Sequence, residues 1–415
     1  MTEIPRDYQL KSGSLLEKPY YPFMKKVVDI LLRYPRHVLF LEPESTDAFE
    51  CSSCGHCCQR PWFINIEKPY YDKWFDVFDQ DPSGLYKNPL LIKEDATDKH
   101  YAEIRRKPGT SECIFLEDDK KCFIHKKYGL EALSFVCRTY PRYEGWFGSY
   151  LGKFLMNSCP DVPALLHNTP DIRYSIGILS QDKWQAYGLL YHPLGMFQGY
   201  LWLGLQLDLI QESQLSPLQS LRYLGQALKQ FILPQTAPYQ AELFEQIHVY
   251  FQDLNRPGTK HLPLRTEFPA AMELIFELLK DYKDCCEFIR ETLFAGLESL
   301  ELRVSEQNLL NAFIKQYLGY RFLNANYYVE NQLTFFYQYY YGLSIQMVLL
   351  QWLAFYYREQ SGQALSSEHL MRATNLIGYR FENSQRMIDI CKKFTPHICL
   401  EGLDILLSFD CGLQT

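Results

Sequence analysis

Four cysteines within eight residues constrain this chain more than any other feature of its sequence. They form the pattern Cys51-x2-Cys54-x2-Cys57-Cys58. Thiolates separated by two residues can converge on one metal, because a tight turn brings both sulfurs to one side, and Gly55 would ease that turn. The pattern therefore predicts a metal centre rather than a set of buried free thiols.

Further cysteines follow in the same part of the chain. Cys113, Cys122, Cys137 and Cys159 bring the number before residue 160 to eight, of 13 in the whole chain. One zinc ion needs only four thiolates, whereas iron–sulfur clusters take closely spaced cysteines together with distant ones. The irregular spacing favours an iron–sulfur cluster, with zinc as the second choice. It does not tell which four of the eight cysteines bind the metal.

Charged residues accompany the cysteines. Arg138 and Arg142 follow Cys137 closely, where they would offset the charge of a thiolate cluster or bind a carboxylate. Packing against nearby acids is an equally good interpretation. His56 and His125 also lie inside the motif, as hydrogen-bonding neighbours more often than as ligands. No catalytic residue is identified, because the chain has no dinucleotide fingerprint, P-loop, HExxH or GxSxG motif.

Composition excludes some partners. The net charge of −7 argues against nucleic acid, whose phosphates require a basic face. The N-terminus shows no basic stretch followed by an apolar one, so no secretory signal is expected. The most hydrophobic windows, Met196–Ile210 and Leu343–Tyr357, are interrupted by Gln or Asp and are shorter than the roughly 20 residues of a membrane span. We expect a soluble cytoplasmic protein without a membrane or nucleic-acid partner.

The residue composition and the hydrophobic periodicity of the sequence change twice along the chain, which predicts three regions. Residues 1–48 form an N-terminal extension with a helix at Pro22–Arg33 and a β-like run at His37–Leu41. Residues 49–165 form an irregular cysteine-rich domain, poor in apolar stripes, in which metal ligation would replace a hydrophobic core. Residues 166–415 form an α-helical bundle, which makes the fold class mainly α.

Seven helices are expected in the bundle, of which the first opens with a Ser-Pro pair suited to a helix N-terminus. They are Ser216–Phe231, Tyr239–Leu254, Thr266–Asp281, Cys285–Leu300, Glu306–Asn324, Leu333–Gln360 and Ser366–Glu382. The vicinal pair Cys285–Cys286 and the later Cys391, Cys399 and Cys411 are interpreted as buried thiols.

The cysteine runs resemble a known family. In order along the chain, CSSCGHCCQRPWFINI, CIFLEDDKKCFIH, CRTYPR and SCP resemble the CxxCxxCC cysteine-cluster proteins, and within them the flagellin lysine N-methylases. The helical half is similar to that family more weakly, around Tyr317–Phe322. Ser134 stands where some members have another cysteine, and Phe381-Glu382-Asn383 replaces a pattern that often reads Glu-His-Asn.

This resemblance implies an S-adenosylmethionine-dependent protein lysine N-methyltransferase with a 4Fe–4S cluster. It implies a protein partner that presents lysine side chains, with Arg138 or Arg142 near the carboxylate of the methyl donor. An apolar channel for lysine could be lined by the aromatic residues of one helix, although core packing is the simpler interpretation. They are Phe335, Phe336, Tyr337, Tyr339, Tyr340 and Tyr341. Two other classes stay open: a non-catalytic zinc or iron module that recruits a partner, and a redox iron–sulfur protein.

Overall fold

The computed structural model describes most of the first half of the chain and the core of the second. The described ranges are 7–12, 37–146, 151–169, 174–180, 215–227, 282–295, 302–323 and 333–378, with a few single positions between them. The chain divides into two compact units. We call Phe49–Tyr143 with Cys159–Val162 the cysteine unit, and the remainder, Met1–Ala48, Glu144–Ser158 and Pro163–Thr415, the helical unit.

The described part is mainly α-helical, as the sequence predicts. The predicted region boundaries at residues 48 and 165 stay predictions. None of the described helices is long and apolar enough to cross a membrane.

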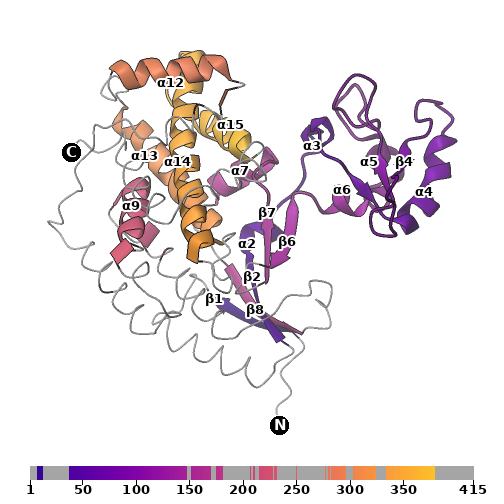
Figure 1. Cartoon of the computed structure of the whole chain (residues 1–415), viewed down its shortest axis with the longest axis horizontal. Coiled ribbons are helices and arrows are strands. Elements are labelled where there is room, and N and C mark those ends of the chain that lie inside the picture. Colours follow the sequence, from indigo (N-terminus) through magenta and orange to yellow (C-terminus); the bar gives the residue numbers. More distant parts are fainter. Residues whose placement is uncertain are drawn as a thin grey trace, which may run out of the picture. The chain divides into compact units, whose positions relative to one another are not determined.

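One five-stranded sheet has the order β1-β8-β2-β7-β6 (Figure 1). Its strands are β1 (Asp7–Ser12), β2 (His37–Pro43), β6 (Arg142–Trp146), β7 (Leu151–Leu155) and β8 (Tyr174–Ser180). Strand β8 is antiparallel to both β1 and β2, whereas β2 and β7 run parallel. Lys153 pairs with Glu42 at 3.0 Å across β2 and β7, and the short helix α2 (Glu44–Asp47) follows β2. The β-like run at His37–Leu41 is thus confirmed, whereas the helix expected at Pro22–Arg33 lies outside the described residues.

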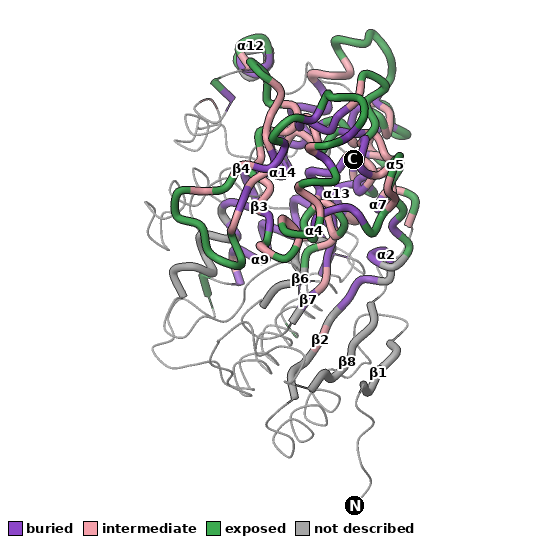
Figure 2. Tube along the Cα trace, turned by 90° about the vertical axis from the view of Figure 1, so that its right-hand side faces the viewer, coloured by how far each residue is buried: buried purple, intermediate pink, exposed green. Residues whose placement is uncertain are grey.

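In the helical unit, α14 (Leu333–Ser361) contacts α9 (Pro217–Ala227), α12 (Lys283–Ala295) and α15 (Ser367–Ile377). Helix α13 (Val304–Leu323) contacts α9 and α15, and α7 (Asp161–His167) begins within the cysteine unit and continues into the helical unit. Every residue of α14 from Gly342 to Phe355 is buried (Figure 2), as expected for a helix that is apolar on all sides.

Five of the seven expected helices are confirmed, as α9 and α12 to α15. The helices expected at Tyr239–Leu254 and Thr266–Asp281 fall almost wholly outside the described residues. The predicted Ser-Pro helix start is also confirmed, because the Ser216 hydroxyl accepts the Gln219 N–H at 3.2 Å in the first turn of α9.

The C-terminal end of α15 lies against the backbone that leads to Cys159. The Asn375 side-chain amide donates to the carbonyl oxygen of Ser158 at 3.0 Å. A Cβ atom at Gly378 would come within 2.6 Å of the backbone of Asn157, so the helix can approach this closely only with glycine there. This contact fixes the chain directly before the last cysteine of the motif.

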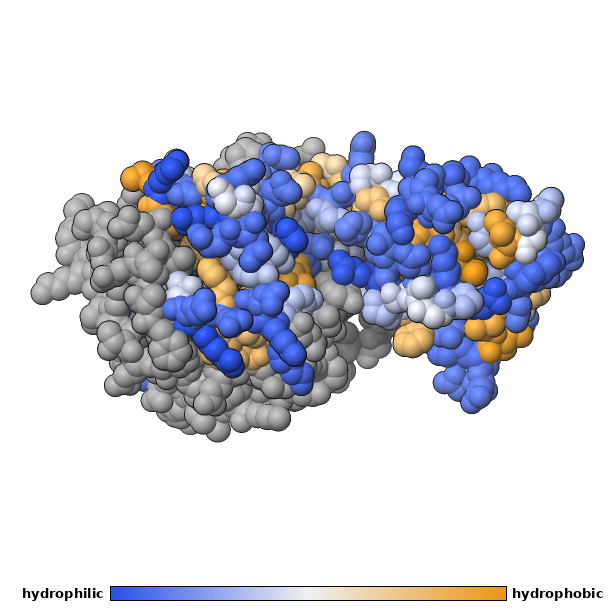
Figure 3. Space-filling view, turned by 90° about the horizontal axis from the view of Figure 1, so that it is seen from above, coloured by the Kyte–Doolittle hydropathy of each residue, from blue (hydrophilic) through white to orange (hydrophobic). Residues whose placement is uncertain are grey.

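The cysteine unit is a small α+β structure. Strands β3 (Asn65–Ile66), β5 (Ala102–Ile104) and β4 (Leu90–Ile92) form an antiparallel sheet in that order. Its helices are α3 (His56–Gln59), α4 (Lys68–Asp79), α5 (Phe123–Tyr128) and α6 (Phe135–Thr139), with a 3₁₀ turn at Leu130–Ala132. Its surface is mostly hydrophilic, with hydrophobic groups between the hydrophilic ones (Figure 3, right-hand side). Phe63, Leu85 and Phe135 are exposed hydrophobic residues of this unit.

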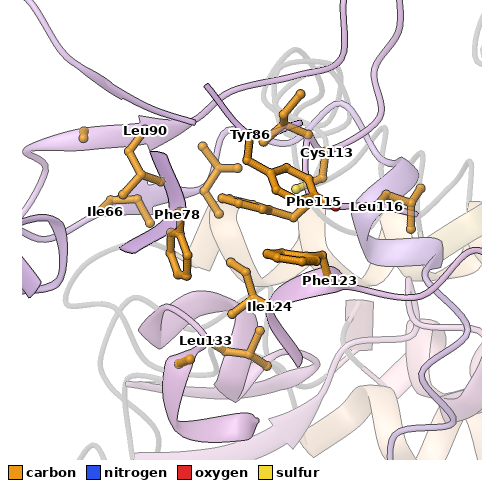
Figure 4. Close-up of a cluster of buried hydrophobic side chains, with 14 residues drawn as sticks. Ile66, Phe78, Tyr86, Leu90, Cys113, Phe115, Leu116, Phe123, Ile124 and Leu133 are labelled. Carbon is orange, nitrogen blue, oxygen red and sulfur yellow. The ribbon is translucent and has the colours of Figure 1, made fainter. Parts of the chain in front are cut away.

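This unit has a hydrophobic core of its own (Figure 4). Phe115 is fully buried, with its ring centroid 5.1 Å from that of Phe78 and 5.3 Å from that of Tyr86. The other core residues are Ile66, Leu90, Ala102, Ile104, Cys113, Ile114, Leu116, Phe123, Ile124, Ala132 and Leu133. The expectation that metal ligation takes the place of a core is therefore wrong. The sequence pattern does not indicate this core, because its residues come from short segments far apart in the sequence, which show no local periodicity.

Candidate metal centre

All eight cysteines before residue 160 line one cavity inside the cysteine unit. The cavity encloses about 340 Å³. Its wall also includes Gly55, Lys121, His125, Ser134 and Asp161. The structure thus brings together every cysteine that the sequence singled out as a candidate ligand.

Two residues with a left-handed backbone conformation shape the segment that carries the first four cysteines. Ser53 has φ 57° and Gly55 has φ 70°, and α3 begins at the next residue. An added Cβ at Gly55 would lie 2.0 Å from the carbonyl oxygen of Lys120, so only glycine fits both the conformation and the space. The tight turn predicted at Gly55 is confirmed. Its close approach to Lys120 also places the loop beside the segment that carries Cys122.

Backbone hydrogen bonds hold the next two cysteines against this loop. The Cys113 N–H donates to the carbonyl oxygen of Cys58 at 2.7 Å. Isolated antiparallel bridges pair Arg106 with Cys113 and Leu116 with Cys122. Cys122 is also the residue immediately before α5, and its sulfur accepts the backbone N–H groups of Ile124 and His125. The thiol positions are therefore set by backbone structure.

Four thiols form a connected set, which we call the first thiol group: Cys57, Cys58, Cys113 and Cys122. The Cys58 sulfur is 4.0 Å from that of Cys57, and the Cys58 thiol is in hydrogen-bond contact with the thiols of Cys113, Cys122 and Cys57.

Protons are distributed unevenly within the first thiol group. Hydrogen bonds to Cys113 and Cys122 raise the pKa of Cys58, which keeps its proton. Its contacts lower the pKa of Cys57 and of Cys113, and lower that of Cys122 to about 7. Thiolate is the form of cysteine that binds metal, so Cys122 is already suited to ligation near neutral pH.

Three further thiols, Cys51, Cys54 and Cys159, form what we call the second thiol group. Burial raises the pKa of Cys51, and raises that of Cys159 to about 12. The Cys159 thiol interacts electrostatically with Asp161, Cys54 and Cys51. The charge interaction of Cys51 is strongest with Cys57, followed by Asp161 and Cys54, so this group is not separate from the first.

Cys137 stands apart from both groups. It lies at the start of α6, where its backbone N–H donates to the Ser134 hydroxyl at 3.3 Å. Burial raises the pKa of its thiol to about 12, with smaller contributions from Cys113, Cys122 and Cys57. Ser134, the serine that replaces a cysteine of some relatives, is thus part of the cavity wall and the N-cap of α6.

The two arginines of the motif do not line the cavity. Arg138 Nη1 is 3.2 Å from Glu131 Oε2 at the surface. Arg142 Nη2 donates to the carbonyl oxygen of Phe49 at 2.7 Å, and its guanidinium lies over the Phe49 ring. Lys121 and Lys126 are the basic side chains in the wall, and Lys126 is paired with Glu117 and Asp119. Sequence reasoning missed Lys121, although its position directly before Cys122 was a usable signal.

The donor chemistry of the cavity fits a thiophilic metal or an iron–sulfur cluster. Eight sulfurs converge there, and backbone N–H groups donate to several of them, as is usual for metal-bound thiolates. As placed, however, no three His, Cys, Asp or Glu side chains of the described ranges are arranged to enclose an ion. That these cysteines are ligands stays a prediction, and the side chains would rotate to close on a metal.

Outside the cysteine unit, the structure supports the interpretation of later residues as packing. Cys285 and Cys286 in α12 are buried, and the Cys286 thiol donates to the carbonyl oxygen of Leu279 at 3.2 Å. Cys391, Cys399 and Cys411 lie beyond the described residues. Of the six aromatic residues considered as a channel lining, only the side chain of Tyr340 is described, and it is fully buried.

A single cavity lined by eight cysteines marks this chain as a cysteine-cluster protein with a candidate metal centre. Comparison with known proteins finds similar sequences. The chain is 28% identical over 140 residues to the flagellar biosynthetic protein FliU of Salmonella muenchen, a match that covers 33% of this chain and 81% of that protein. It is 25% identical over 139 residues to the lysine-N-methylases of Salmonella typhimurium and Salmonella choleraesuis, covering 33% of this chain and 34% of each of them.

These relatives support the flagellin lysine N-methylase family for this chain. The match spans about a third of the length of the two lysine-N-methylases. No protein-family model matches the chain, and no solved structure is similar to it.

Proposed function

We propose that this chain is an S-adenosylmethionine-dependent protein lysine N-methyltransferase that carries a 4Fe–4S cluster in the cysteine unit. The similarity to the two lysine-N-methylases is the observation that carries the proposal. The cavity lined by eight cysteines supports the metal part of it. The substrate would be a protein with accessible lysine side chains, with flagellin as the first candidate.

The first thiol group is the ligand set that the contacts favour. Cys57, Cys58, Cys113 and Cys122 supply four sulfurs, the number that a 4Fe–4S cluster takes from protein. Were only three of these four thiols to bind the cluster, one iron would be left without a protein ligand and could take the amino and carboxylate groups of the methyl donor, which would orient its methyl group.

Other residues of the cavity would assist by charge and by excluding water. Lys121 lies in the wall beside Cys122 and would offset the negative charge of bound thiolates or of a carboxylate. Ile104, Phe115 and Ile124 provide an apolar wall on the same cavity. An apolar surrounding lowers the pKa of a lysine amine, and only the neutral amine has the lone pair that attacks the methyl carbon.

The reaction balances without an oxidant. A bond forms between the lysine nitrogen and the methyl carbon while the carbon–sulfur bond of the sulfonium breaks. The sulfonium becomes a neutral thioether and the amine loses one proton. Arg138 and Arg142 keep their predicted role at the donor carboxylate as part of the proposal, although Glu131 and the Phe49 carbonyl are their partners in the structure.

A methyl-transfer assay tests the proposal. Protein purified without oxygen is incubated with S-adenosylmethionine carrying a labelled methyl group and with flagellin, and modified lysines are located by mass spectrometry. We expect label on lysine nitrogen, and loss of at least a hundredfold in rate for the Cys57→Ser, Cys58→Ser double variant. The matched control, Cys285→Ser with Cys286→Ser, removes a vicinal pair far from the cavity in sequence and should keep the transfer. Metal-loaded protein that neither binds the methyl donor nor methylates protein would contradict the proposal.

One observation favours a non-catalytic zinc module as the second candidate. The 4.0 Å between the sulfurs of Cys57 and Cys58 is close to the spacing of about 3.8 Å expected for two thiolates on one tetrahedral zinc with Zn–S bonds of about 2.3 Å. Stoichiometric zinc, no inorganic sulfide and no binding of S-adenosylmethionine would make this function the better account.

A further inference from the structure

Arg106 lies directly opposite Cys113 in the cysteine unit. The two residues form an isolated antiparallel bridge. The backbone hydrogen bonds that frame this bridge are made by the residues on either side of Arg106 and Cys113, at 2.8 and 3.0 Å, and not between the two residues themselves. In such a non-hydrogen-bonded pair the two Cα atoms are about 4.5 Å apart and both side chains are on the same face. The Arg106 and Cys113 side chains therefore leave the backbone side by side.

That face is the one that borders the cavity. Cys113 lines the cavity, and so does Ile104, which lies two residues before Arg106 in the segment that continues β5 toward the bridge. Side chains alternate between the two faces of an extended chain, so Arg106 shares the face of Ile104, and Arg105 lies on the opposite face. Arg106 itself is half-buried and is not part of the cavity wall. It is therefore placed to act on the cavity through Cys113 and not by touching a bound group.

One donor of the Arg106 guanidinium is not used by the fold. Its Nη2 atom is buried and has no hydrogen-bond partner among the residues that the structure describes. Burying a donor without an acceptor lowers stability, so such a donor in a folded protein calls for an explanation. The next basic residue, Lys107, differs in this respect, because it pairs with Glu112 at 3.3 Å. Arg106 thus brings a positive charge and a spare donor next to one of the candidate ligands.

A metal-bound thiolate has the properties that Arg106 would complement. Such a sulfur keeps negative charge and accepts N–H hydrogen bonds, and these bonds tune the affinity and the reduction potential of the metal. The hydrogen-bond contact with Cys58 lowers the pKa of the Cys113 thiol most, and the positive charge of Arg106 lowers it further. The charge of Arg106 therefore acts on this sulfur with the sign that the backbone pairing predicts.

We propose that Arg106 is a positioning residue of the metal centre, which stabilises the metal-bound thiolate of Cys113 by its charge and by donating from Nη2 to that sulfur. The inference rests on the metal part of the proposed function, namely on Cys113 as a ligand, and not on methyl transfer. Because a guanidinium favours a negatively charged centre, Arg106 raises the affinity for the metal. In an iron–sulfur cluster it also favours the reduced form, which carries one more negative charge.

Metal competition with the full chain tests this inference, with Zn²⁺ as the probe. Metal-free protein, prepared without oxygen, is titrated with Zn²⁺ against a coloured chelator. We expect Arg106→Gln to bind zinc about tenfold more weakly than the parent chain, and Arg106→Lys, which keeps the charge, to lose less. Arg105→Gln is the matched control, because Arg105 Nε is also buried without a partner among the described residues while its side chain lies on the opposite face. This control should bind zinc as the parent chain does.

Two further measurements separate this role from a structural one. Urea unfolding should show metal-free Arg106→Gln to be at least as stable as the parent chain, because the variant removes a buried donor that has no partner. In protein loaded with iron and sulfide, the midpoint potential of Arg106→Gln should lie below that of the parent, since a positive charge near the cluster is lost.

Three results would overturn the inference. Unchanged zinc affinity in Arg106→Gln would mean that the arginine does not act on the metal. An equal loss of affinity in Arg105→Gln would mean that the face of the strand does not matter. Lower stability of metal-free Arg106→Gln would assign the residue to the fold. Methyl transfer is judged separately: a chain with the expected zinc response that methylates no protein would support this inference and contradict the proposed function alone.

Discussion

The helical unit and the cysteine unit bury their aromatic side chains in different ways. In the helical unit, α14 contributes a continuous buried run from Gly342 to Phe355, with Trp352 fully enclosed. In the cysteine unit, Phe78 comes from α4, Phe115 from a loop and Phe123 from α5. The core of the helical unit can therefore be recognised in a short stretch of sequence. The core of the cysteine unit forms only when segments far apart in the sequence pack together. The cysteine unit therefore has a core of its own beside its thiols, and the following measurements separate the contribution of that core to stability from the contribution expected of metal ligation.

The largest effect is expected from emptying the core of the cysteine unit. Phe115→Ala should lower the free energy of unfolding by about 3–5 kcal/mol, because it removes a fully buried ring that contacts Phe78 and Tyr86. Trp352→Ala is the matched change in the helical unit and should cost a similar amount. Urea unfolding, combined with limited proteolysis to show which unit opens, measures both. Near-normal stability of metal-loaded Phe115→Ala would show that ligation dominates this unit after all.

The next effect is expected where the cysteine loop meets the chain around Lys120. Gly55→Ala should cost about 2–4 kcal/mol and reduce metal content, because alanine is strained at φ 70° and its Cβ would collide with the Lys120 carbonyl. Gly84→Ala is the control, since Gly84 has φ 69° with open space around it and should cost only about 1 kcal/mol. Thermal unfolding and metal analysis are the measurements. Equal losses in the two variants would mean that the conformation alone matters and the close approach does not.

A smaller effect is expected from two serine N-caps, of which one lies in each unit. Ser134→Ala and Ser216→Ala each remove a hydroxyl that accepts a backbone N–H, from Cys137 and Gln219 respectively. Each should cost about 1 kcal/mol. Only Ser134 lines the cavity, so only its variant should also change the visible spectrum of metal-loaded protein. A spectral change of the same size in Ser216→Ala would indicate that the spectrum responds to a general loss of stability and not to the residue that lines the cavity.

The smallest effect is expected in how the free energy of unfolding changes with pH. Near neutral pH this free energy does not change with the protonation of Asp81, so the effect is seen only in acid. Asp81 is buried and paired with Lys127, and this bond, with those from Ser83 and Tyr128, holds the pKa of its carboxyl well below the ordinary value of about 3.9. The stabilisation is complete above that ordinary value and is lost as the pH falls below about 4, where the unfolded chain binds the proton first.

Asp81→Asn removes this titration, so its unfolding free energy should change less with pH between neutral and acid than that of the parent protein. Asp119→Asn serves as the comparison: Lys126 also lowers the pKa of this carboxyl, but the side chain is half exposed, so the slope should change less than in Asp81→Asn. Urea unfolding at a series of pH values, followed by fluorescence, measures the slope. An unchanged acid slope in Asp81→Asn would assign the acid sensitivity to other carboxylates.

The features that could be predicted from the sequence are those that depend on residues close together in the chain. The gathering of the cysteines, the turn at Gly55, the strand at His37–Leu41 and five helices of the second half all belong to this kind. The five-stranded sheet does not, because β8 pairs with β1 and β2, which lie more than a hundred residues earlier in the chain, and no short segment indicates such a partner. The partners of the arginines could not be predicted for a related reason. Nothing next to Arg142 in sequence indicates that its guanidinium binds the carbonyl of Phe49.

The bond between the Cys113 N–H and the Cys58 carbonyl also closes a long excursion of the chain, which contains α4 and all three strands of the small sheet. In polymer terms, the entropy lost on closing such a loop grows only with the logarithm of its length, so doubling it would cost about 0.6 kcal/mol. Insertions and deletions between these two cysteines are therefore thermodynamically inexpensive, whereas one residue more or fewer between Cys51 and Cys58 would change the turn itself. Relatives of this chain should keep the first spacing fixed and vary the second freely. Distant members are better found by searching for the short run than for the interval that follows it.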